Sequence, residues 1–152
     1  MPTFATDANI LEYEPDIKTY GIQEFTDLHE KTYNDIIRLL NIRWFPKANY
    51  GVDDITTIGI NGTNTKLDAD KLTSSQFTRA AVFHVLYQYI YPRLSTFDPD
   101  GDIFREKMAY YKQKFEEEFD LLLRYGIEYD VNEDGTVTES EKQPFHFNRL
   151  VR

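Results

Sequence analysis

The twelve residues from Asp130 to Glu141 have the residue types and the spacing of a calcium-binding loop. Calcium prefers about six to eight oxygen ligands, and loops of this kind supply them from fixed positions. The sixth position must allow a sharp turn, and Gly135 stands there. The predicted ligands are the first, third, fifth, seventh (through its carbonyl) and twelfth residues of the loop, namely Asp130, Asn132, Asp134, Thr136 and Glu141.

A complete calcium-binding hand also needs a second helix after the loop. Pro144 comes three residues after Glu141, where it would interrupt such a helix in its first turn. The same residues also suit an acidic turn without metal, in which Asp and Asn side chains bond the backbone and Gly135 takes a positive φ angle. Both interpretations stay open. We expect no obligatory cofactor, and calcium is the one candidate ligand.

The three histidines are far apart in the sequence and form no evident catalytic or metal-binding group. His84 lies in a strongly apolar segment, which favours a hydrogen-bonded core histidine over a ligand or a base. His29 and Tyr33 are four residues apart, which favours ordinary packing with the ring nitrogens bonded. The chain has no cysteine, no glycine-rich phosphate loop and no nucleophile elbow. We therefore expect that the protein is not an enzyme.

Composition predicts a folded domain that does not span a membrane and does not bind nucleic acid through its phosphates. The 152 residues are 41% hydrophobic and include eleven Phe and eleven Tyr, enough for a substantial core. The N-terminus lacks the basic and apolar regions of a signal peptide, and no apolar stretch is long enough to span a bilayer. We therefore expect a protein made in the cytoplasm, with no membrane partner. A net charge of -9 argues against binding through DNA phosphates.

Helical periodicity predicts a mainly α fold, a small helical bundle over residues 1–141. Thr6 or Asp7 is the expected cap of a short first helical turn, and a helix is expected over residues 23–41. Another helix, apolar nearly all round, is expected from Ser74 or Ser75 to Tyr91, where Pro92 ends it.

The longest helix is expected to begin at Asp98-Pro99 and to end at Gly126 in a left-handed conformation. Its apolar residues recur every three or four positions, which predicts one buried stripe. The stripe comprises Phe104, Met108, Tyr111, Phe115, Phe119 and Leu122, with Lys107, Lys112, Glu117 and Arg124 on the opposite side. The cluster Asp98, Asp100 and Asp102 has its glycine in the wrong place for a calcium loop and is interpreted as a cap.

Two segments fall outside the helical pattern. Residues 45–72 are expected to form an inserted loop, within which Asn61-Gly62 between residues 55–60 and 63–67 predicts a β-hairpin. Residues 142–152 are expected to form an extended C-terminal arm. They include three basic residues and no acid, whereas residues 1–141 hold all 26 acids. Each segment could pack on its own chain or on another one, and such an arm suits the acidic surface of a neighbouring subunit. The predicted partner-binding residues are Phe145, Phe147, Arg149, Leu150, Arg152, Ile58 and Ile60.

The order of these features resembles that of tailed-bacteriophage head-tail connector (adaptor) proteins. The similarity covers most of the chain outside residues 45–72. In the first half of the chain it rests on Thr6-Asp7-Ala8-Asn9-Ile10 and on Arg43-Trp44 at the end of a helix. In the second half it rests on the apolar helix from Phe77 to Tyr91 and on a last helix that contains Tyr110-Tyr111 and residues 115–123. This last helix leads to Tyr129-Asp130 and the acidic loop.

The resemblance implies a virion structural protein located at the head-tail junction. Such a subunit assembles with copies of itself as a homo-oligomeric ring, bound to the portal protein on one side and to a downstream neck or tail protein on the other. The ring continues the DNA channel, and DNA passes through without sequence-specific binding. The resemblance also implies that the C-terminal arm contacts the portal or a neighbouring subunit. The alternative function is a calcium-binding interaction module that resembles half of an EF-hand.

Overall fold

A computed structural model describes residues 2–44, 67–96, 99–130 and 132–139, and these are mainly α-helical, as predicted. The chain forms two compact units. Met1–Ile36 and Ser74–Phe119 make the first, and Ile37–Thr73 and Asp120–Arg152 make the second. The predicted hairpin with Ile58 and Ile60 lies outside the described residues. So do Glu141 and the whole C-terminal arm, residues 142–152.

In the first unit, α1 (Asp7–Tyr13) begins where the sequence predicts. The backbone N–H and the hydroxyl of Thr6 both donate to Asn9 Oδ1, each at 2.9 Å, so the two residues close the helix start. Ile10 is fully buried. A single 3-10 turn, η1 (Ile17–Tyr20), follows and ends at Gly21, whose φ of 105° suits glycine.

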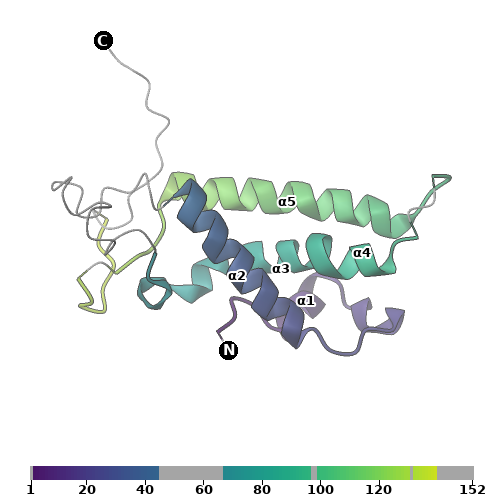
Figure 1. Ribbon diagram of the computed structural model, residues 1–152, viewed down its shortest axis with the longest axis horizontal. Helices are drawn as coiled ribbons and strands as arrows, with labels where there is room; N and C mark the ends of the chain where they lie inside the picture. Colours follow the sequence, from purple (N-terminus) through teal and green to yellow (C-terminus); the bar gives the residue numbers. More distant parts are fainter. Residues whose placement is uncertain (1, 45–66, 97–98, 131, 140–152) are drawn as a thin grey trace, which may run out of the picture. The chain divides into compact units, whose positions relative to one another are not determined.

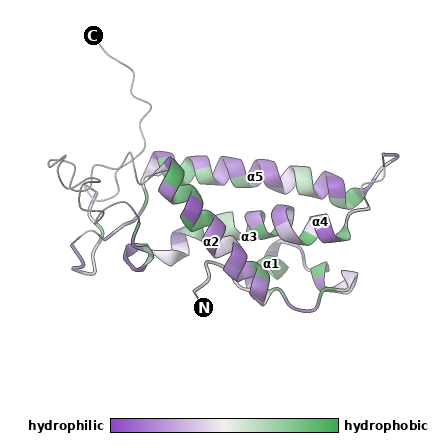
Figure 2. Ribbon diagram, in the orientation of Figure 1, coloured by the Kyte–Doolittle hydropathy of each residue, from purple (hydrophilic) through white to green (hydrophobic). Residues whose placement is uncertain are grey.

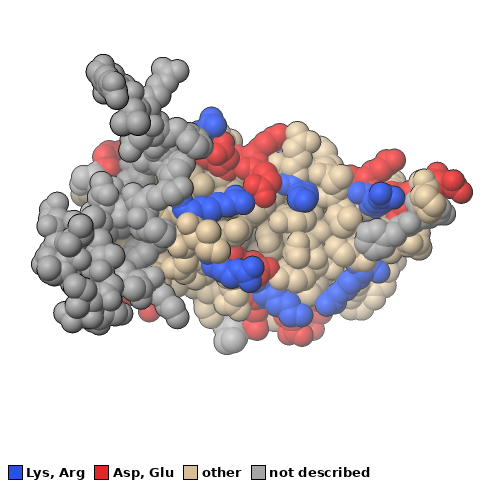
Figure 3. Space-filling view, turned by 45° about the horizontal axis from the view of Figure 1, so that its top comes forward, with Lys and Arg blue, Asp and Glu red and all other residues tan. Residues whose placement is uncertain are grey.

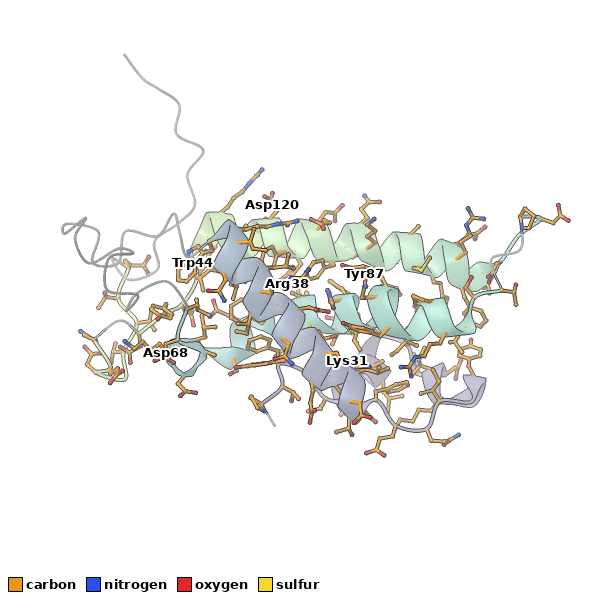
Figure 4. The ribbon with its side chains drawn as sticks, in the orientation of Figure 1. Lys31, Arg38, Trp44, Asp68, Tyr87 and Asp120 are labelled. Carbon is orange, nitrogen blue, oxygen red and sulfur yellow. The ribbon has the colours of Figure 1, made fainter. Side chains whose placement is uncertain are left out.

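Helix α2 (Thr26–Arg43) starts three residues after the predicted start and ends two after the predicted end. Its first-unit part buries Leu28 and Ile36 completely or nearly so, and Phe25, just before the helix, is also buried. Towards the other end, Trp44 directly follows α2 in the second unit (Figure 4). Its side chain is 1% exposed.

The apolar helix predicted to end at Pro92 is longer and less regular than expected. It comprises a 3-10 turn η4 (Ser74–Phe77), α3 (Thr78–Val85), a π-helical turn η5 (Leu86–Ile90) and α4 (Tyr91–Leu94). The N–H of Tyr91 donates to the carbonyl of Leu86, five residues back. In an α-helix the ring of Pro92 would clash with the carbonyl four residues before it, and the wider π turn gives an alternative register. Pro92 is therefore accommodated, and the prediction that it ends the helix was wrong.

Helix α5 (Ile103–Tyr125) begins later than the sequence suggested. Its start is made by Asp102 instead of Asp98-Pro99, because Asp102 Oδ1 accepts the N–H of Phe104 at 2.9 Å. The other carboxylate oxygen of Asp102 accepts the hydroxyl of Ser95 and the N–H of Thr96. The end of α5 is as predicted, since Gly126 has a φ of 106° and donates to the carbonyl of Leu122.

Within the first unit, α5 runs antiparallel to α3 and α4 (Figure 1). The ring centroids of Phe83 and Tyr111 are 5.9 Å apart, and those of Tyr91 and Phe104 are 6.0 Å apart. The predicted stripe is confirmed at Tyr111, Phe115 and Phe119, which are buried. At its C-terminal end the buried residue is Leu123, whereas Leu122 is half-buried. Polar and apolar residues alternate along α5 as this amphipathic pattern requires (Figure 2).

Candidate functional site

The acidic loop follows a short antiparallel contact in the second unit. Leu72 and Tyr129 form an isolated β-bridge, in which Thr73 donates to the carbonyl of Glu128 and Asp130 donates to that of Lys71. The hydroxyl of Tyr129 accepts the N–H of Asp68 at 3.3 Å. Its ring packs edge-on against Trp44, with the centroids 5.6 Å apart. The first residue of the loop is therefore fixed in place by backbone hydrogen bonds and aromatic packing.

From Asp130 to Thr136 the loop is held by side-chain oxygens that accept its own N–H groups. Asp130 Oδ2 accepts from Gly135 at 2.8 Å, and its Oδ1 accepts from Asp134 at 3.2 Å. Asn132 Oδ1 also accepts from Asp134, and Asp134 Oδ1 accepts from Thr136 at 2.8 Å. Gly135 has the predicted positive φ, 83°. These bonds are those expected of a self-supporting acidic turn.

Three of the predicted calcium ligands, Asp130, Asn132 and Asp134, lie together in this turn, since the N–H of Asp134 donates to both Asp130 Oδ1 and Asn132 Oδ1. Asn132 Nδ2 donates to Asp134 Oδ2 at 3.1 Å, so these two predicted ligands contact each other. Nearby, Lys71 Nζ lies 3.5 Å from the carboxylate of Glu133. Over the described part of the chain, no group of three or more His, Cys, Asp or Glu side chains is arranged to hold a metal ion. Glu141, the predicted bidentate ligand, lies outside that part.

A second polar cluster surrounds His84 in the first unit. Its Nδ1 lies 3.3 Å from the hydroxyl of Thr32, and its Nε2 lies 3.7 Å from Asp35 Oδ2. The hydroxyl of Tyr89 donates to the same Asp35 oxygen. Tyr87, on the π turn, points toward α5 (Figure 4), and its ring packs against Phe115 with the centroids 5.6 Å apart. A hydroxyl, an imidazole and a carboxylate thus lie in a row.

This arrangement does not provide a working nucleophile. Thr32 is 1% exposed and His84 is 4% exposed, so no substrate reaches the hydroxyl or the ring. Burial lowers the pKa of His84 to about 4, although the carboxylates of Asp35 and Glu116 favour the charged form. The ring is therefore neutral near pH 7. His84 is a hydrogen-bonded core histidine, as the sequence predicted.

One ring nitrogen of His29 contacts a carboxylate, and the other has no hydrogen-bond partner among the described residues. Its Nε2 lies 3.0 Å from Asp7 Oδ1, while Asp7 Oδ2 lies 3.0 Å from Lys18 Nζ. Partial burial raises the pKa of Asp7, but hydrogen bonds and charge from Lys18 and His29 outweigh it, so the net pKa is lowered. Nδ1 of His29 is buried without a partner among the described residues, so the prediction that both ring nitrogens are bonded was wrong. Tyr33 packs on Phe4, as ordinary packing predicts.

A partly buried ion pair joins the end of α1 to α5. Glu14 Oε2 lies 2.9 Å from Lys107 Nζ, and its Oε1 accepts the hydroxyl of Tyr111 at 2.8 Å. Burial raises the pKa of the Glu14 carboxyl, but the bonds from Lys107 and Tyr111 outweigh it and lower the net pKa. Lys107 is therefore half-buried and paired, not on the solvent side as predicted. Sequence analysis missed the pair, because its members are 93 positions apart and no local pattern links them.

Replacing Glu14 with Gln is expected to lower the free energy of unfolding by about 1–3 kcal/mol. The amide cannot pair with Lys107, and a partly buried ammonium then loses its counter-charge. The change is measured by denaturant unfolding. Glu12→Gln is the matched control, since Glu12 is exposed and lies two residues before Glu14, and we expect a change within about 0.5 kcal/mol. Equal effects of the two substitutions would contradict the structural role of Glu14.

Comparison with known proteins adds no relative to this picture: no family model, no curated protein and no solved structure matches the chain.

Proposed function

We propose that the protein is a head-tail connector (adaptor), a structural protein of a tailed-phage virion that forms a ring between portal and tail. The order of the helices carries this proposal. The Thr6-capped α1, α2 ending at Arg43 with Trp44 directly after it, the buried α3 and the long α5 follow one another as the resemblance implies. After α5, Gly126 and the β-bridge between Leu72 and Tyr129 lead into the acidic loop.

The partners of this proposal are further copies of the chain, the portal protein and a downstream neck or tail protein. The C-terminal arm, with Phe145, Phe147, Arg149, Leu150 and Arg152, is the proposed contact with the portal or a neighbouring subunit. Its basic charge complements the acidic remainder of the chain. In the inserted loop, Ile58 and Ile60 are a second proposed contact.

An acidic subunit also suits a ring through which DNA passes. A basic lumen would hold the phosphates, whereas net negative charge favours release. On the face seen in Figure 3, basic and acidic side chains of the described residues are interspersed with uncharged surface. None of the described helices is long and apolar enough to cross a membrane.

The proposal predicts a defined oligomer when the portal is present. A ring requires heterologous contacts, in which one face of each subunit meets a different face of the next. Native mass spectrometry of the protein mixed with purified portal is expected to give one stoichiometry with many copies of the chain. The protein alone is the reference, because assembly can await the portal. Free chains alone in the mixture would contradict the proposal.

A calcium-binding interaction module is the second candidate function. The observation in its favour is the loop backbone, where Gly135 has a φ of 83° and its N–H bonds to the Asp130 carboxylate. A lone half-hand without a second helix is expected to bind weakly, with a Kd on the order of 10⁻⁴ to 10⁻³ M. Binding to the folded state alone would raise the melting temperature with the logarithm of calcium concentration.

We expect ~1 mM calcium to raise the melting temperature by less than about one degree, because the loop oxygens already accept backbone N–H groups. Differential scanning calorimetry with and without calcium measures the shift. Magnesium is the matched ion, since its smaller octahedral shell fits such a loop poorly. A larger calcium shift that disappears in Glu141→Gln would favour the calcium module. That result would leave the connector proposal untouched.

A further inference from the structure

Helix α5 carries a second apolar stripe that faces solvent. Ile103 is 62% exposed, Tyr110 54%, Leu121 58% and Tyr125 66%. Because α5 is one continuous helix, their positions around its axis follow from its periodicity, and all four fall on one side. This side is distinct from the one that buries Tyr111 and the other core residues of α5. Four large apolar side chains in one exposed row indicate a contact surface.

The spacing along this side is that of a helix seam. Positions 103, 110, 114, 117 and 121 are separated by seven, four, three and four residues, the heptad spacing with which two helices pack along their length. Lys114 belongs to the same row, since its Nζ lies 5.5 Å from the centroid of the Tyr110 ring and 3.5 Å from the Glu117 carboxylate. The helix has 23 residues, so the row extends over about 34 Å.

The charges of α5 are divided between its two halves. Residues 103–114 carry four basic residues and one acid, namely Arg105, Lys107, Lys112, Lys114 and Glu106. Residues 115–125 carry four acids and one basic residue, namely Glu116, Glu117, Glu118, Asp120 and Arg124. Two such helices repel each other when parallel at the same level. When antiparallel, each basic half lies on the acidic half of the other, so the helix is complementary to itself.

One antiparallel register pairs the central apolar and charged residues of the row, whereas Ile103 then lies beyond the end of the partner helix and Tyr125 lies opposite Glu106. If Tyr110 packs on Leu121 of a second copy, two-fold symmetry gives this contact twice and also sets Lys114 opposite Glu117 twice. The same register brings Lys107 into line with Arg124. Both already have partners in their own chain, since Lys107 pairs with Glu14 at 2.9 Å and Arg124 pairs with Asp120 at 3.1 Å.

We infer that the exposed side of α5 binds the same side of α5 in a second copy of the chain, antiparallel and across a two-fold axis. The contact is isologous, unlike the heterologous contacts of a ring, and does not depend on the proposed function. A single helix pair of this length, with charged residues in its seam, makes a weak dimer that dissociates on dilution.

Charge exchange at the centre of the seam tests the inference in the full chain. Sedimentation velocity between roughly 1 µM and 1 mM is expected to show a reversible monomer-dimer equilibrium. Lys114→Glu sets like charges opposite Glu117 twice per dimer and is expected to raise the Kd about tenfold or more. The double variant Lys114→Glu/Glu117→Lys restores opposite charges and is expected to return the Kd to that of the parent.

Two controls separate this contact from effects on folding and on the ring. Circular dichroism of each variant should match the parent, because both side chains lie on the outer side of α5, where such substitutions cost little. Leu121→Ser is expected to weaken the dimer, whereas Ala109→Ser, on another exposed side of α5, is not. A chain that stays monomeric at ~1 mM would overturn the inference. So would a dimer unchanged by Lys114→Glu or unrestored by the double variant. Ring formation by Lys114→Glu with the portal is measured in a separate experiment, because the dimer contact and the ring contacts are different.

Discussion

Deletion of residues 144–152 is expected to abolish ring assembly and to leave the helices intact. The arm interleaves apolar and basic residues and has no helical or strand period, so it adds little to the subunit's own core. On a neighbouring acidic subunit, both apolar burial and charge attraction favour its binding. We expect the portal-bound oligomer to disappear in native mass spectrometry, while the melting temperature of the free chain changes by less than about 2 °C.

Substitutions within the arm sharpen this prediction. Phe145→Ser with Phe147→Ser should act like the deletion, because it removes the aromatic anchors. Gln143→Ser with Asn148→Ser changes polar residues of the same arm and should leave assembly unaffected. A large loss of helix or of melting temperature on truncation would mean that the arm packs on its own chain. The intersubunit role of Phe145, Phe147 and Arg149 would then be wrong.

The free energy of unfolding is expected to fall as the pH is lowered, because His84 is protonated in the unfolded chain at a higher pH than in the folded chain. Much of this loss precedes the full protonation of the carboxylates. Burial lowers the pKa of His84 from about 6.5 to about 4, so between these values the unfolded chain binds a proton that the folded chain does not. The stabilisation is complete above pH 6.5 and falls as the pH decreases toward 4. A difference of this size corresponds to about 3 kcal/mol. Urea unfolding across this window measures it.

His84→Gln is the reference for this titration. Gln is uncharged at every pH and can still bond Thr32, so the difference between the two curves isolates the imidazole. Asp7 and Glu14, whose pKa values are lowered, keep their contribution above their unfolded pKa values and lose it as the pH falls through the folded ones. Asp7 and Glu14 are present in both the parent and His84→Gln, so their contributions to the free energy of unfolding cancel when the two curves are subtracted. An NMR titration that gave His84 a pKa near 6.5 would contradict the buried, neutral ring.

Local rules predicted the parts of the fold that depend on neighbours in the sequence. The Thr6 start of α1 and the Gly126 end of α5 need only residues within one turn. The buried stripe through Tyr111 and Phe119 follows from helical period alone. The side-chain bonds of Asp130 and Asp134 within the acidic loop are equally local, so the turn that they make was predictable.

Non-local contacts explain the errors. Asp98 and Asp102 are equally good helix starts by residue type, and the choice of Asp102 depends on Ser95 and Thr96, which its other oxygen also binds. Pro92 was expected to end a helix because the π turn that accommodates it leaves no mark in the pattern of apolar residues. The bond between Glu14 and Lys107 joins two surfaces that only the folded chain brings together. Periodicity places a residue on a face and does not identify what covers that face.

Negative-stain imaging of the chain mixed with purified portal tests the connector proposal most directly. We expect added ring-shaped density on one face of the portal, coaxial with its channel, and the same added density with Lys114→Glu if the α5 contact is separate from the ring. The variant that lacks residues 144–152 should leave the portal bare. Portal particles that look the same with and without the full-length chain, at concentrations where the chain is folded, would contradict the proposal.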